Sequence, residues 1–466
     1  MITPDLSAFS AHVLVPDPSD RSRYEVPARG RSGVAAGVAL PSNLEALRQI
    51  VREAFAAGIR LLPQGANTGL VGASVPTTDG DVVVLSLDRL NQTVHVNPTD
   101  ATAVVSAGVR LSALNEAARP FGLHLPVDLA PDPTIGGMIA TNTGGSRVLQ
   151  YGPMRAHVLG VEVVAADADA TVFGGLGELR KDSRGVDVAH LVVGSGGTLG
   201  VVASAVLALS RLPRRTEVWW LALGDPDQAT ALFDSLDSAR PGTLTAFEFV
   251  SREALHCALT APGAPPNPFG NDLPAACVLA EWSSTSEAAL DGLETDVAAA
   301  FDHGLLADGI LVDAAAGWAL RHRVSDSVRT FGVVLGHDIS TARHALMPAR
   351  SEGIEAIRAL APEAVVCDFG HLGDGGLHLN VLFPHATDAP TPQLAARIRA
   401  AVDHVVVRHH GSYSAEHGLG PLNAARWLAD TPLIEQRIVA SIKSVVDPLS
   451  ILGHPGHPYN LLAHLR

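Results

Sequence analysis

The stretch Pro63-Gln64-Gly65-Ala66-Asn67-Thr68-Gly69-Leu70 is a Gly-rich loop that directly follows an apolar segment, residues 59–62, which we expect to be a strand. Glycine allows positive φ angles and a close approach of the backbone to a ligand. Successive backbone N–H groups then form a concave nest that suits a pyrophosphate. The loop lacks the G-x-G-x-x-G pattern and a following Lys-Ser/Thr pair, so neither a Rossmann nor an NTPase site is indicated. Taken alone, such a loop is more often a structural turn.

Two further small-residue segments favour the ligand-binding interpretation. Residues 131–137 (PDPTIGG) lead into residues 141–145 (TNTGG), and residues 194–200 (GSGGTLG) open another predicted strand. Three such segments in one half of the chain suggest a long ligand in a groove lined by backbone.

The sequence around these segments predicts an α+β fold. Apolar residues recur every three to four positions from 43 to 58, which predicts a helix with Ser42 as its N-cap. We expect further strands at 82–87, 158–165, 171–173 and 201–209, and a strand–helix–strand unit at 102–126. Beyond Arg215 we expect Ala-rich helices such as 286–301, strands such as 364–369, and a surface loop at 261–268.

The composition argues against several classes of function. The 466 residues include 33 basic and 48 acidic ones, a formal net charge of −15, which disfavours nucleic acid or an anionic membrane as a partner. A locally positive pocket for an anionic substrate is compatible with this charge. Three cysteines without a C-x-x-C pair favour a reducing cytoplasm over a disulfide framework. We expect no signal peptide and no transmembrane helix, because the required apolar runs are missing.

A histidine-rich segment, residues 369–380 (FGHLGDGGLHLN), is the second informative feature. Apolar strand, Gly-rich turn and apolar strand predict a hairpin, with His378 and Asn380 on one face and His371 turned back beside them. Residues 414–420 (SAEHGLG) add a carboxylate next to a histidine. Two histidines, one carboxylate and an open position describe a catalytic zinc site. The alternative is a pair of ordinary hairpin histidines, which is the commoner origin of such spacing.

Together these segments resemble the vanillyl-alcohol-oxidase/PCMH superfamily of FAD-linked oxidoreductases, and within it the D-2-hydroxyglutarate and D-lactate dehydrogenase branch. The resemblance covers almost the whole chain and is carried by LLPQGANTGLVGAS, DPTIGGMIATNTGGSRVLQYG, VGSGGTLGVV, GHLGDGGLHLNV and SAEHGLG. It implies a PCMH-type FAD-binding domain and an α+β substrate domain with an antiparallel sheet.

The resemblance also implies which residues bind FAD. The first segment would wrap the pyrophosphate, and the second would line the isoalloxazine ring and its phosphates. The first segment has no histidine, so non-covalent FAD is implied. Relatives often carry glutamate where this chain has Gly196, so a side-chain contact is lost while the backbone role remains. The implied residues are Pro63, Gln64, Gly65, Ala66, Asn67, Thr68, Gly69, Leu70, Ala73, Ser74, Pro131, Asp132, Thr134, Gly136, Gly137, Ala140, Thr141, Asn142, Gly144, Gly145, Tyr151, Gly152, Gly196, Gly200 and Val201.

By the same resemblance, His371, His378 and Glu416 bind Zn²⁺ or another divalent metal. Asn380 and His417 match positions that contact the substrate. Residues 318–321 match a W-x-x-R motif whose Arg321 clamps a carboxylate, and Ser325, one helical turn further on, matches a hydroxyl-bearing position. His417 is the expected base.

These groups suit oxidation of a 2-hydroxy acid. A Lewis acid lowers the pKa of the substrate hydroxyl and orients it. Histidine side chains titrate in the range that suits a proton acceptor, and flavin supplies the redox step.

One departure from the branch bears on specificity. The branch often has Lys or Arg shortly before an Asp-x-Ser step, where this chain has Gly336; His337, Arg343 or His344 could compensate. Without compensation, a dicarboxylate loses an ionic contact that contributes about 1.5–3 kcal/mol. The expected substrate is D-2-hydroxyglutarate, with D-lactate, D-malate and glycolate as alternatives. Residues 453–457 (GHPGH) also replace an Asn-Pro-Gly-Lys-like turn of relatives.

We therefore expect an FAD-binding domain at 1–215, a substrate- and metal-binding domain at 216–420, and a C-terminal segment at 421–466 that packs back on the first. The chain has no Fe–S cysteine cluster, so an external acceptor would take the electrons: a quinone, an electron-transfer flavoprotein or another carrier. A homodimer is the base-rate expectation. The rival functions are a metal-dependent hydrolase and a flavin-binding subunit without catalysis of its own.

Overall fold

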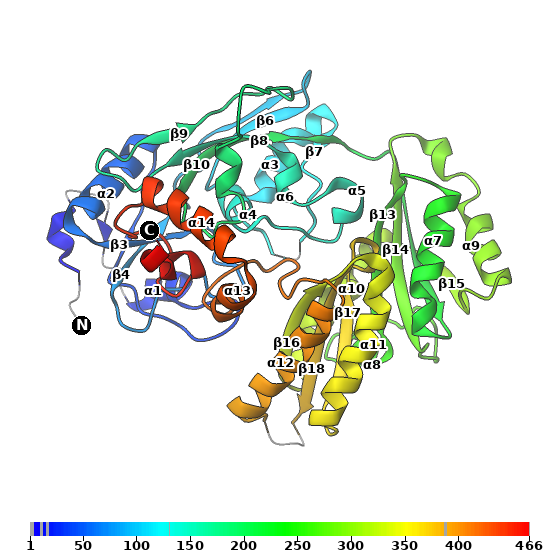
Figure 1. Ribbon diagram of the computed structural model, residues 1–466. Coiled ribbons are helices and arrows are strands. Elements are labelled where there is room, and N and C mark those ends of the chain that lie inside the picture. The colour runs from blue at the N-terminus through cyan, green and yellow to red at the C-terminus, as the bar shows by residue number, and fades with distance from the viewer. Residues whose placement is uncertain (1–3, 10–12, 15–17, 130, 386–388, 466) are drawn as a thin grey trace. The chain divides into compact units, whose positions relative to one another are not determined.

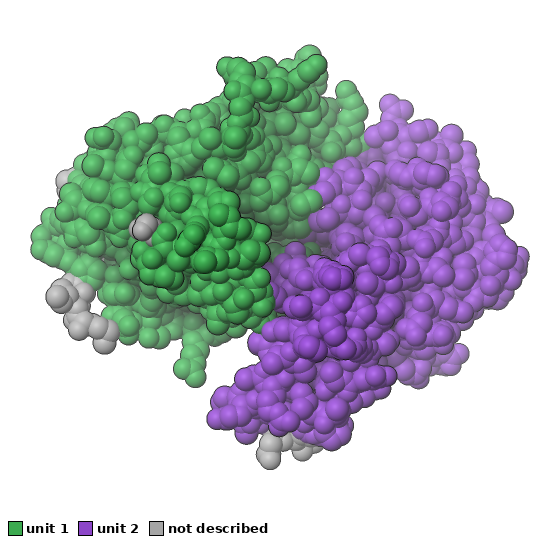
Figure 2. Space-filling model, in the orientation of Figure 1, with its two compact units in different colours: residues 1–144, 153–212, 416–466 green, residues 145–152, 213–415 purple. Residues whose placement is uncertain are grey.

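A computed structural model describes residues 4–9, 13–14, 18–129, 131–385 and 389–465. The chain divides into two compact units (Figure 2). Unit 1 contains Met1–Gly144, Pro153–Leu212 and Glu416–Arg466, and unit 2 contains Gly145–Gly152 and Pro213–Ala415. None of the described helices is long and apolar enough to cross a membrane.

Unit 1 combines several small sheets with short helices (Figure 1). Its strands are β1 (Val13–Leu14), β2 (Gly37–Ala39), β3 (Arg60–Gln64), β4 (Val82–Ser86), β5 (Val94–Asn97), β6 (Thr102–Ser106), β7 (Leu123–His124), β8 (Val158–Val164), β9 (Val172–Gly174), β10 (Val201–Ala208) and β11 (Ser210–Arg211). Its helices are α1 (Pro18–Glu25), α2 (Leu44–Ala57), α3 (Leu111–Ala118), α4 (Ile135–Thr141), α6 (Met154–His157), α13 (Ala424–Asp430) and α14 (Leu433–Val446). In the described part, the strand orders are β1-β2-β4-β3, β5-β6-β10-β8-β9 and β11-β7.

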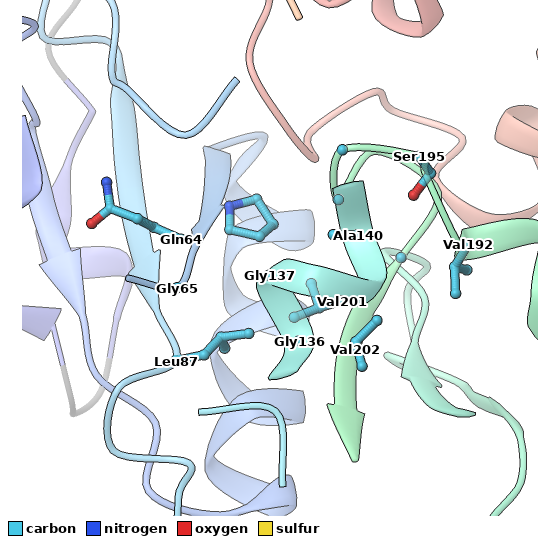
Figure 3. Close-up of a pocket in the computed structure, with 14 residues that line it drawn as sticks. Gln64, Gly65, Leu87, Gly136, Gly137, Ala140, Val192, Ser195, Val201 and Val202 are labelled. Carbon is cyan, nitrogen blue, oxygen red and sulfur yellow. The ribbon is translucent and has the colours of Figure 1, made fainter. Parts of the chain in front are cut away.

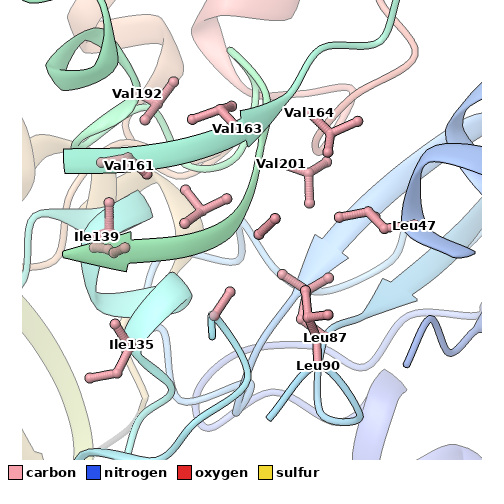
Figure 4. Close-up of a cluster of buried hydrophobic side chains, with 14 of the residues drawn as sticks. Leu47, Leu87, Leu90, Ile135, Ile139, Val161, Val163, Val164, Val192 and Val201 are labelled. Carbon is pink, nitrogen blue, oxygen red and sulfur yellow. The ribbon is translucent and has the colours of Figure 1, made fainter. Parts of the chain in front are cut away.

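The core of unit 1 forms where the apolar faces of these elements meet. Leu47 of α2, Ile139 of α4, Val161 of β8 and Val201 of β10 belong to one buried cluster (Figure 4). Helix α2 begins one residue later than predicted. Its N-cap is Asn43 and not Ser42, because the Asn43 Oδ1 atom accepts a hydrogen bond from the Ala46 N–H. The cluster holds α4 against β6 and β10, which positions the Gly-rich segments around it.

The C-terminal segment is tied into unit 1 by a buried lysine. Lys443 of α14 lies 2.5 Å from Asp447, and both side chains are fully buried. The Lys443 Nζ atom also donates to the carbonyl of Thr198 at 2.8 Å. Since Thr198 lies in the third Gly-rich segment, the hydrogen bond from Lys443 fixes α14 against that segment.

Unit 2 is built on one antiparallel sheet. Its strands are β12 (Arg215–Leu223), β13 (Leu244–Ser251), β14 (Ala276–Ser284), β15 (Asp308–Val312), β16 (Gly332–Ser340), β17 (Val365–Gly370) and β18 (Gly376–Pro384). Its helices are α5 (Val148–Tyr151), α7 (Ala229–Ala239), α8 (Arg252–Thr260), α9 (Leu293–Asp302), α10 (Ala314–Arg329), α11 (Arg343–Leu360) and α12 (Pro392–Arg408). The strand order is β15-β12-β14-β13-β17-β18-β16.

Two buried clusters cover the two faces of this sheet. Helices α7, α9, α11 and α12 pack on one face, and α8 and α10 pack on the other (Figure 1). The predicted hairpin is confirmed: β17 and β18 pair antiparallel, joined by a short 3-10 turn at Leu372–Asp374. The single helix predicted at 286–301 is wrong. A 3-10 turn at Glu287–Leu290 precedes α9, and Gly292 (φ 75°) separates them in a left-handed conformation that breaks a helix.

Candidate active site

A cavity in unit 1 lies where the three Gly-rich segments meet (Figure 3). Its empty volume is about 410 Å³, which includes space open to solvent. Nine predicted FAD-binding residues line it: Pro63, Gln64, Gly65, Gly136, Gly137, Ala140, Gly196, Gly200 and Val201. Five lining residues were not predicted: Leu87, Val192, Ser195, Gly197 and Val202. Of these, Ser195 and Gly197 belong to the GSGGTLG segment. Membership in that segment was the sequence signal from which both could have been predicted.

Close backbone approach explains the glycines of the first two segments. A Cβ atom at Gly65 would lie 2.1 Å from the Thr134 Oγ1 atom, and one at Gly136 would lie 2.7 Å from the Ala107 Cβ atom. Neither approach tolerates a side chain. Thr134 is also the N-cap of α4, where its Oγ1 atom accepts from the Gly137 N–H. The loop after β3 and the start of α4 therefore meet at contact distance.

The third segment forms a cradle of left-handed backbone. Gly194, Gly196 and Gly197 have φ angles of 86°, 62° and 73°, a conformation that side chains disfavour. Between them the Ser195 Oγ atom is buried and has no hydrogen-bond partner among the described residues. Gln64 and Ser195 lie on opposite sides of the cavity (Figure 3), and the Gln64 amide points away from it and donates to the carbonyls of Tyr24 and Ser74. A cradle of this shape with an unsatisfied hydroxyl fits a polar, elongated group such as FAD.

The other predicted FAD-binding residues do not line the cavity. Some support the loops: the Asn67 Nδ2 atom donates to the Val26 carbonyl at 3.0 Å, and the Ser74 Oγ atom donates to the Asn67 Oδ1 atom at 2.9 Å. Asp132 accepts from Ser112. The set outside the cavity is Ala66, Asn67, Thr68, Gly69, Leu70, Ala73, Ser74, Pro131, Asp132, Thr134, Thr141, Asn142, Gly144, Gly145, Tyr151 and Gly152, of which Gly145, Tyr151 and Gly152 belong to unit 2. Their contacts with FAD stay predictions.

The two departures noted at Gly196 and at the C-terminal turn meet in the structure. A Cβ atom at Gly196 would lie 2.9 Å from the Nε2 atom of His457. His457 is fully buried, and burial together with the nearby charge of Lys443 lowers its pKa to about 3. A neutral imidazole thus packs against Gly196, so a glutamate at position 196 would require both residues to change.

In unit 2, a buried carboxylate joins two of the predicted site residues. The Glu248 Oε1 atom lies 2.7 Å from the Nδ1 atom of His371, and its Oε2 atom lies 2.5 Å from a terminal nitrogen of Arg321. Burial by itself would raise the pKa of the Glu248 carboxyl, but its contacts with His371 and Arg321 hold the pKa at about 2. Glu248 is a functional candidate that the sequence did not reveal.

Arg321 is itself buried and lies over the ring of Phe369, 4.9 Å from its centroid. One turn earlier on α10, the Trp318 Nε1 atom donates to the buried Glu281 carboxylate at 2.7 Å. Ser325 is half-buried on the same face of α10, four residues after Arg321. The W-x-x-R motif thus locks α10 onto the sheet and leaves Arg321 at the Glu248 carboxylate.

The register of β16 and β18 places four positions on one sheet face. Gly336 stands opposite Asn380, and Asp338 stands opposite His378. The Asp338 carboxylate lies 3.6 Å from the Nδ1 atom of His378. The His378 ring lies 5.4 Å from the ring of His371. The hairpin therefore gathers both predicted histidines as the sequence indicated.

Four residues offer donor atoms that one metal ion could share. Unit 2 ends at Ala415, whose N–H donates to the carbonyl of Asp338, and the next two residues are Glu416 and His417. Donor atoms of Asp338, His378, Glu416 and His417 all lie within 4.8 Å of one another. Imidazole nitrogens with carboxylate oxygens are a donor set that Zn²⁺ accepts. The group contains the predicted ligands His378 and Glu416 and adds Asp338 and His417, while His371 lies outside it.

Relatives often have a basic residue at position 336, where this chain has glycine. None of the three nearby basic residues places its side chain at that position. His337 points to the opposite face of the sheet, where its Nδ1 atom lies 3.1 Å from the Leu379 carbonyl. The Arg343 guanidinium donates to the Gly373 carbonyl and lies over the Phe233 ring. His344 is exposed on α11.

Comparison with known proteins gives consistent matches. Residues 35–174 match the family described as FAD binding domain, and residues 212–456 match the family described as FAD linked oxidases, C-terminal domain. The chain is 34% identical over 430 residues to the D-2-hydroxyglutarate dehydrogenase of Xanthomonas citri pv. viticola, covering 90% of this chain and 88% of the relative. It is 35% identical to the protein of that name from Stutzerimonas stutzeri, with 90% of each chain covered.

Among solved structures, p-cresol methylhydroxylase with substrate bound superimposes with a TM-score of 0.75 at 14% identity, covering 96% of this chain and 94% of that one. This likeness confirms the predicted fold, a PCMH-type FAD-binding domain joined to a domain with an antiparallel sheet.

Proposed function

Because the chain belongs to the family of FAD-linked oxidases, we propose that this oxidoreductase converts a D-2-hydroxy acid to the 2-oxo acid with the help of a divalent metal. The observation that carries the proposal is the set of four donor atoms within 4.8 Å at Asp338, His378, Glu416 and His417. The family membership removes the hydrolase alternative. It also sets the cofactor, FAD.

Bound FAD supplies the two-electron acceptor for the reaction. The three Gly-rich segments would hold it in the cavity of unit 1 through backbone N–H groups and the Ser195 hydroxyl. We propose that FAD is bound non-covalently, because the loop after β3 has no histidine.

By the family resemblance, His371, His378 and Glu416 would hold the metal. The observed donor group shares His378 and Glu416 with this set and has Asp338 and His417 in place of His371. A divalent ion there supplies a Lewis acid that makes the substrate hydroxyl more acidic. Arg321 and Ser325 would bind a substrate carboxylate, Asn380 would orient the substrate, and His417 would accept the hydroxyl proton.

Among the acids considered, we favour D-2-hydroxyglutarate, because the relatives bear that name. D-lactate, D-malate and glycolate are alternatives, because Gly336 supplies no charge on the sheet face that carries Asn380. The chain also leaves the electron acceptor open to a quinone, an electron-transfer flavoprotein or another carrier.

Replacement of Gly336 by lysine is expected to raise kcat/KM for D-2-hydroxyglutarate by about tenfold to a hundredfold, because one charged contact contributes about 1.5–3 kcal/mol. A Cβ atom at position 336 would lie 3.3 Å from the Asn380 Oδ1 atom. The lysine side chain would therefore begin beside a residue that is predicted to contact the substrate. Steady-state kinetics with D-2-hydroxyglutarate and D-lactate measure the effect.

Gly336→Met is the matched control, with similar length and no charge. The lysine effect should be absent for D-lactate, which has no second carboxylate. Equal changes for both acids, or the same gain in the methionine variant, would contradict the assignment of this position.

An anaerobic absorbance titration tests the proposed function. Addition of the four acids in turn to the purified protein should bleach the flavin band with at least one of them. A yellow protein that no hydroxy acid bleaches would overturn the substrate class while leaving the FAD site intact.

Three further parts of the proposal concern the setting of the enzyme. We propose functional domains at 1–215, 216–420 and 421–466 for FAD binding, substrate and metal binding, and a returning C-terminal segment. We propose a cytoplasmic location, which the three cysteines without a C-x-x-C pair favour, and a homodimer as the assembly. Size-exclusion chromatography with light scattering tests the assembly.

A further inference from the structure

We infer that Glu248 is a positioning residue that fixes both the metal-binding histidine His371 and the substrate-binding arginine Arg321; this rests on the proposed function. A single carboxylate contacts both side chains, through Oε1 to His371 at 2.7 Å and through Oε2 to Arg321 at 2.5 Å. No other residue of the proposed site contacts Glu248 in the described interactions.

The contact to His371 selects which ring nitrogen can bind a metal. A carboxylate accepts a hydrogen bond and cannot donate one, so the proton of a neutral His371 ring stays on Nδ1, the atom beside Glu248. The lone pair is then on Nε2. An anionic partner at Nδ1 also makes the opposite nitrogen a stronger ligand, and removal of such partners typically lowers metal affinity about 10- to 100-fold.

The contact to Arg321 holds its guanidinium at the same carboxylate. The Arg321 side chain is 7% exposed and the Glu248 side chain 1%. Bulk water therefore cannot take the place of either side chain as the hydrogen-bonding partner of the other. The Arg321 Nε atom is buried and has no hydrogen-bond partner among the described residues. Glu248 thus orients one terminal nitrogen of the guanidinium, and the Nε donor is not engaged by a protein acceptor among the described residues.

The backbone around Glu248 keeps the carboxylate in place. Strand β13 pairs with β14 on one side and with β17 on the other, with Phe249 opposite Gly370 and Val250 opposite Phe369. The strand that carries Glu248 is therefore hydrogen-bonded to the strand that leads into His371. The sheet sets the distance between the carboxylate and the imidazole.

Asp368 provides a matched control on the other face of the same sheet. It is also 1% exposed and pairs with one arginine, Arg350, in a two-point contact. It stands opposite Leu379, on the face that α11 covers, and so contacts neither His371 nor Arg321. Asp368→Asn removes a buried charge of the same kind without touching the proposed site.

The test compares Zn²⁺ affinity and kinetics in the FAD-loaded wild type, Glu248→Gln and Asp368→Asn. Zn²⁺ affinity is measured by competition with a chromophoric chelator, and thermal unfolding reports the stability of each variant. We expect Glu248→Gln to weaken Zn²⁺ binding about 10- to 100-fold and to raise KM for the hydroxy acid, while Asp368→Asn keeps the wild-type Zn²⁺ affinity. Equal Zn²⁺ affinity in all three proteins would overturn the inference.

Glu248→Gln leaves Arg321 as an unpaired buried charge, which could impair folding. A second variant therefore keeps the inference testable. The double variant Glu248→Gln, Arg321→Gln removes both charges, and its Zn²⁺ affinity should fall by the same factor. An unchanged affinity there would also overturn the inference. If the wild type binds no Zn²⁺, the metal part of the proposed function fails instead, which separates the two outcomes.

Discussion

Replacement of His417 by glutamine is expected to lower the rate of flavin reduction by a D-2-hydroxy acid about 10²- to 10⁴-fold, the range in which a positioned general base contributes. Glutamine keeps a polar side chain of similar size but cannot accept a proton at neutral pH. Anaerobic stopped-flow absorbance measures the rate directly, because the flavin band bleaches in a single turnover.

Because His417 also belongs to the group of four donor atoms, its role as base must be separated from a role as ligand. If His417 is the base, His417→Gln should still bind FAD and Zn²⁺, and only its rate of flavin reduction should fall. Loss of Zn²⁺ in proportion to the rate would instead identify His417 as a ligand. His344→Gln, an exposed substitution on α11, is the control and should reduce its flavin at the wild-type rate.

The hairpin and its histidines could be predicted because their information is local. Alternating apolar residues around a Gly-rich turn determine two paired strands, and the period of two places His378 and Asn380 on one face. The loop after β3 carried a weaker local signal, because its glycines indicated a ligand only together with the two other Gly-rich segments. Motifs confined to a dozen residues carry their own geometry.

Glu248 and Asp338 could not be predicted in the same way. Each lies on a strand far in sequence from its partner, and only the register of β13 with β17 and of β16 with β18 brings the pairs together. Register also decides which of two neighbouring residues faces the site. Asp338 does and His337 does not, although both were equally available in the sequence.

Ser195 was not predicted because its surroundings also depend on contacts that are distant in the sequence. The family resemblance pointed to its neighbour Gly196. The backbone on either side of Ser195 is held by long-range contacts, since the Gly196 N–H donates to the Ala140 carbonyl of α4 and Lys443 of α14 donates to the Thr198 carbonyl. Long-range packing determines which residue of a small-residue segment presents a side chain.

Removal of the divalent metal is expected to suppress flavin reduction at least a hundredfold, because a Lewis acid contributes several kcal/mol to the ionisation of an alcohol and a factor of ten corresponds to about 1.4 kcal/mol. Dialysis against a chelator followed by the anaerobic assay measures the loss. Addition of Zn²⁺ should restore the rate. Full activity after metal removal, confirmed by elemental analysis, would refute metal assistance and leave the FAD-linked chemistry in place.

Ligand variants locate the ion more finely. His378 belongs both to the resemblance-based set and to the observed donor group, so His378→Ala should lose Zn²⁺ on either account. The third protein ligand differs between the two accounts, since His371 belongs only to the first and Asp338 only to the second. Loss of Zn²⁺ in His371→Gln with retention in Asp338→Asn would place the ion beside the Glu248–His371 pair. The reverse pattern would place it beside the Asp338–His378 pair and would remove the physical basis for a metal-directed role of Glu248.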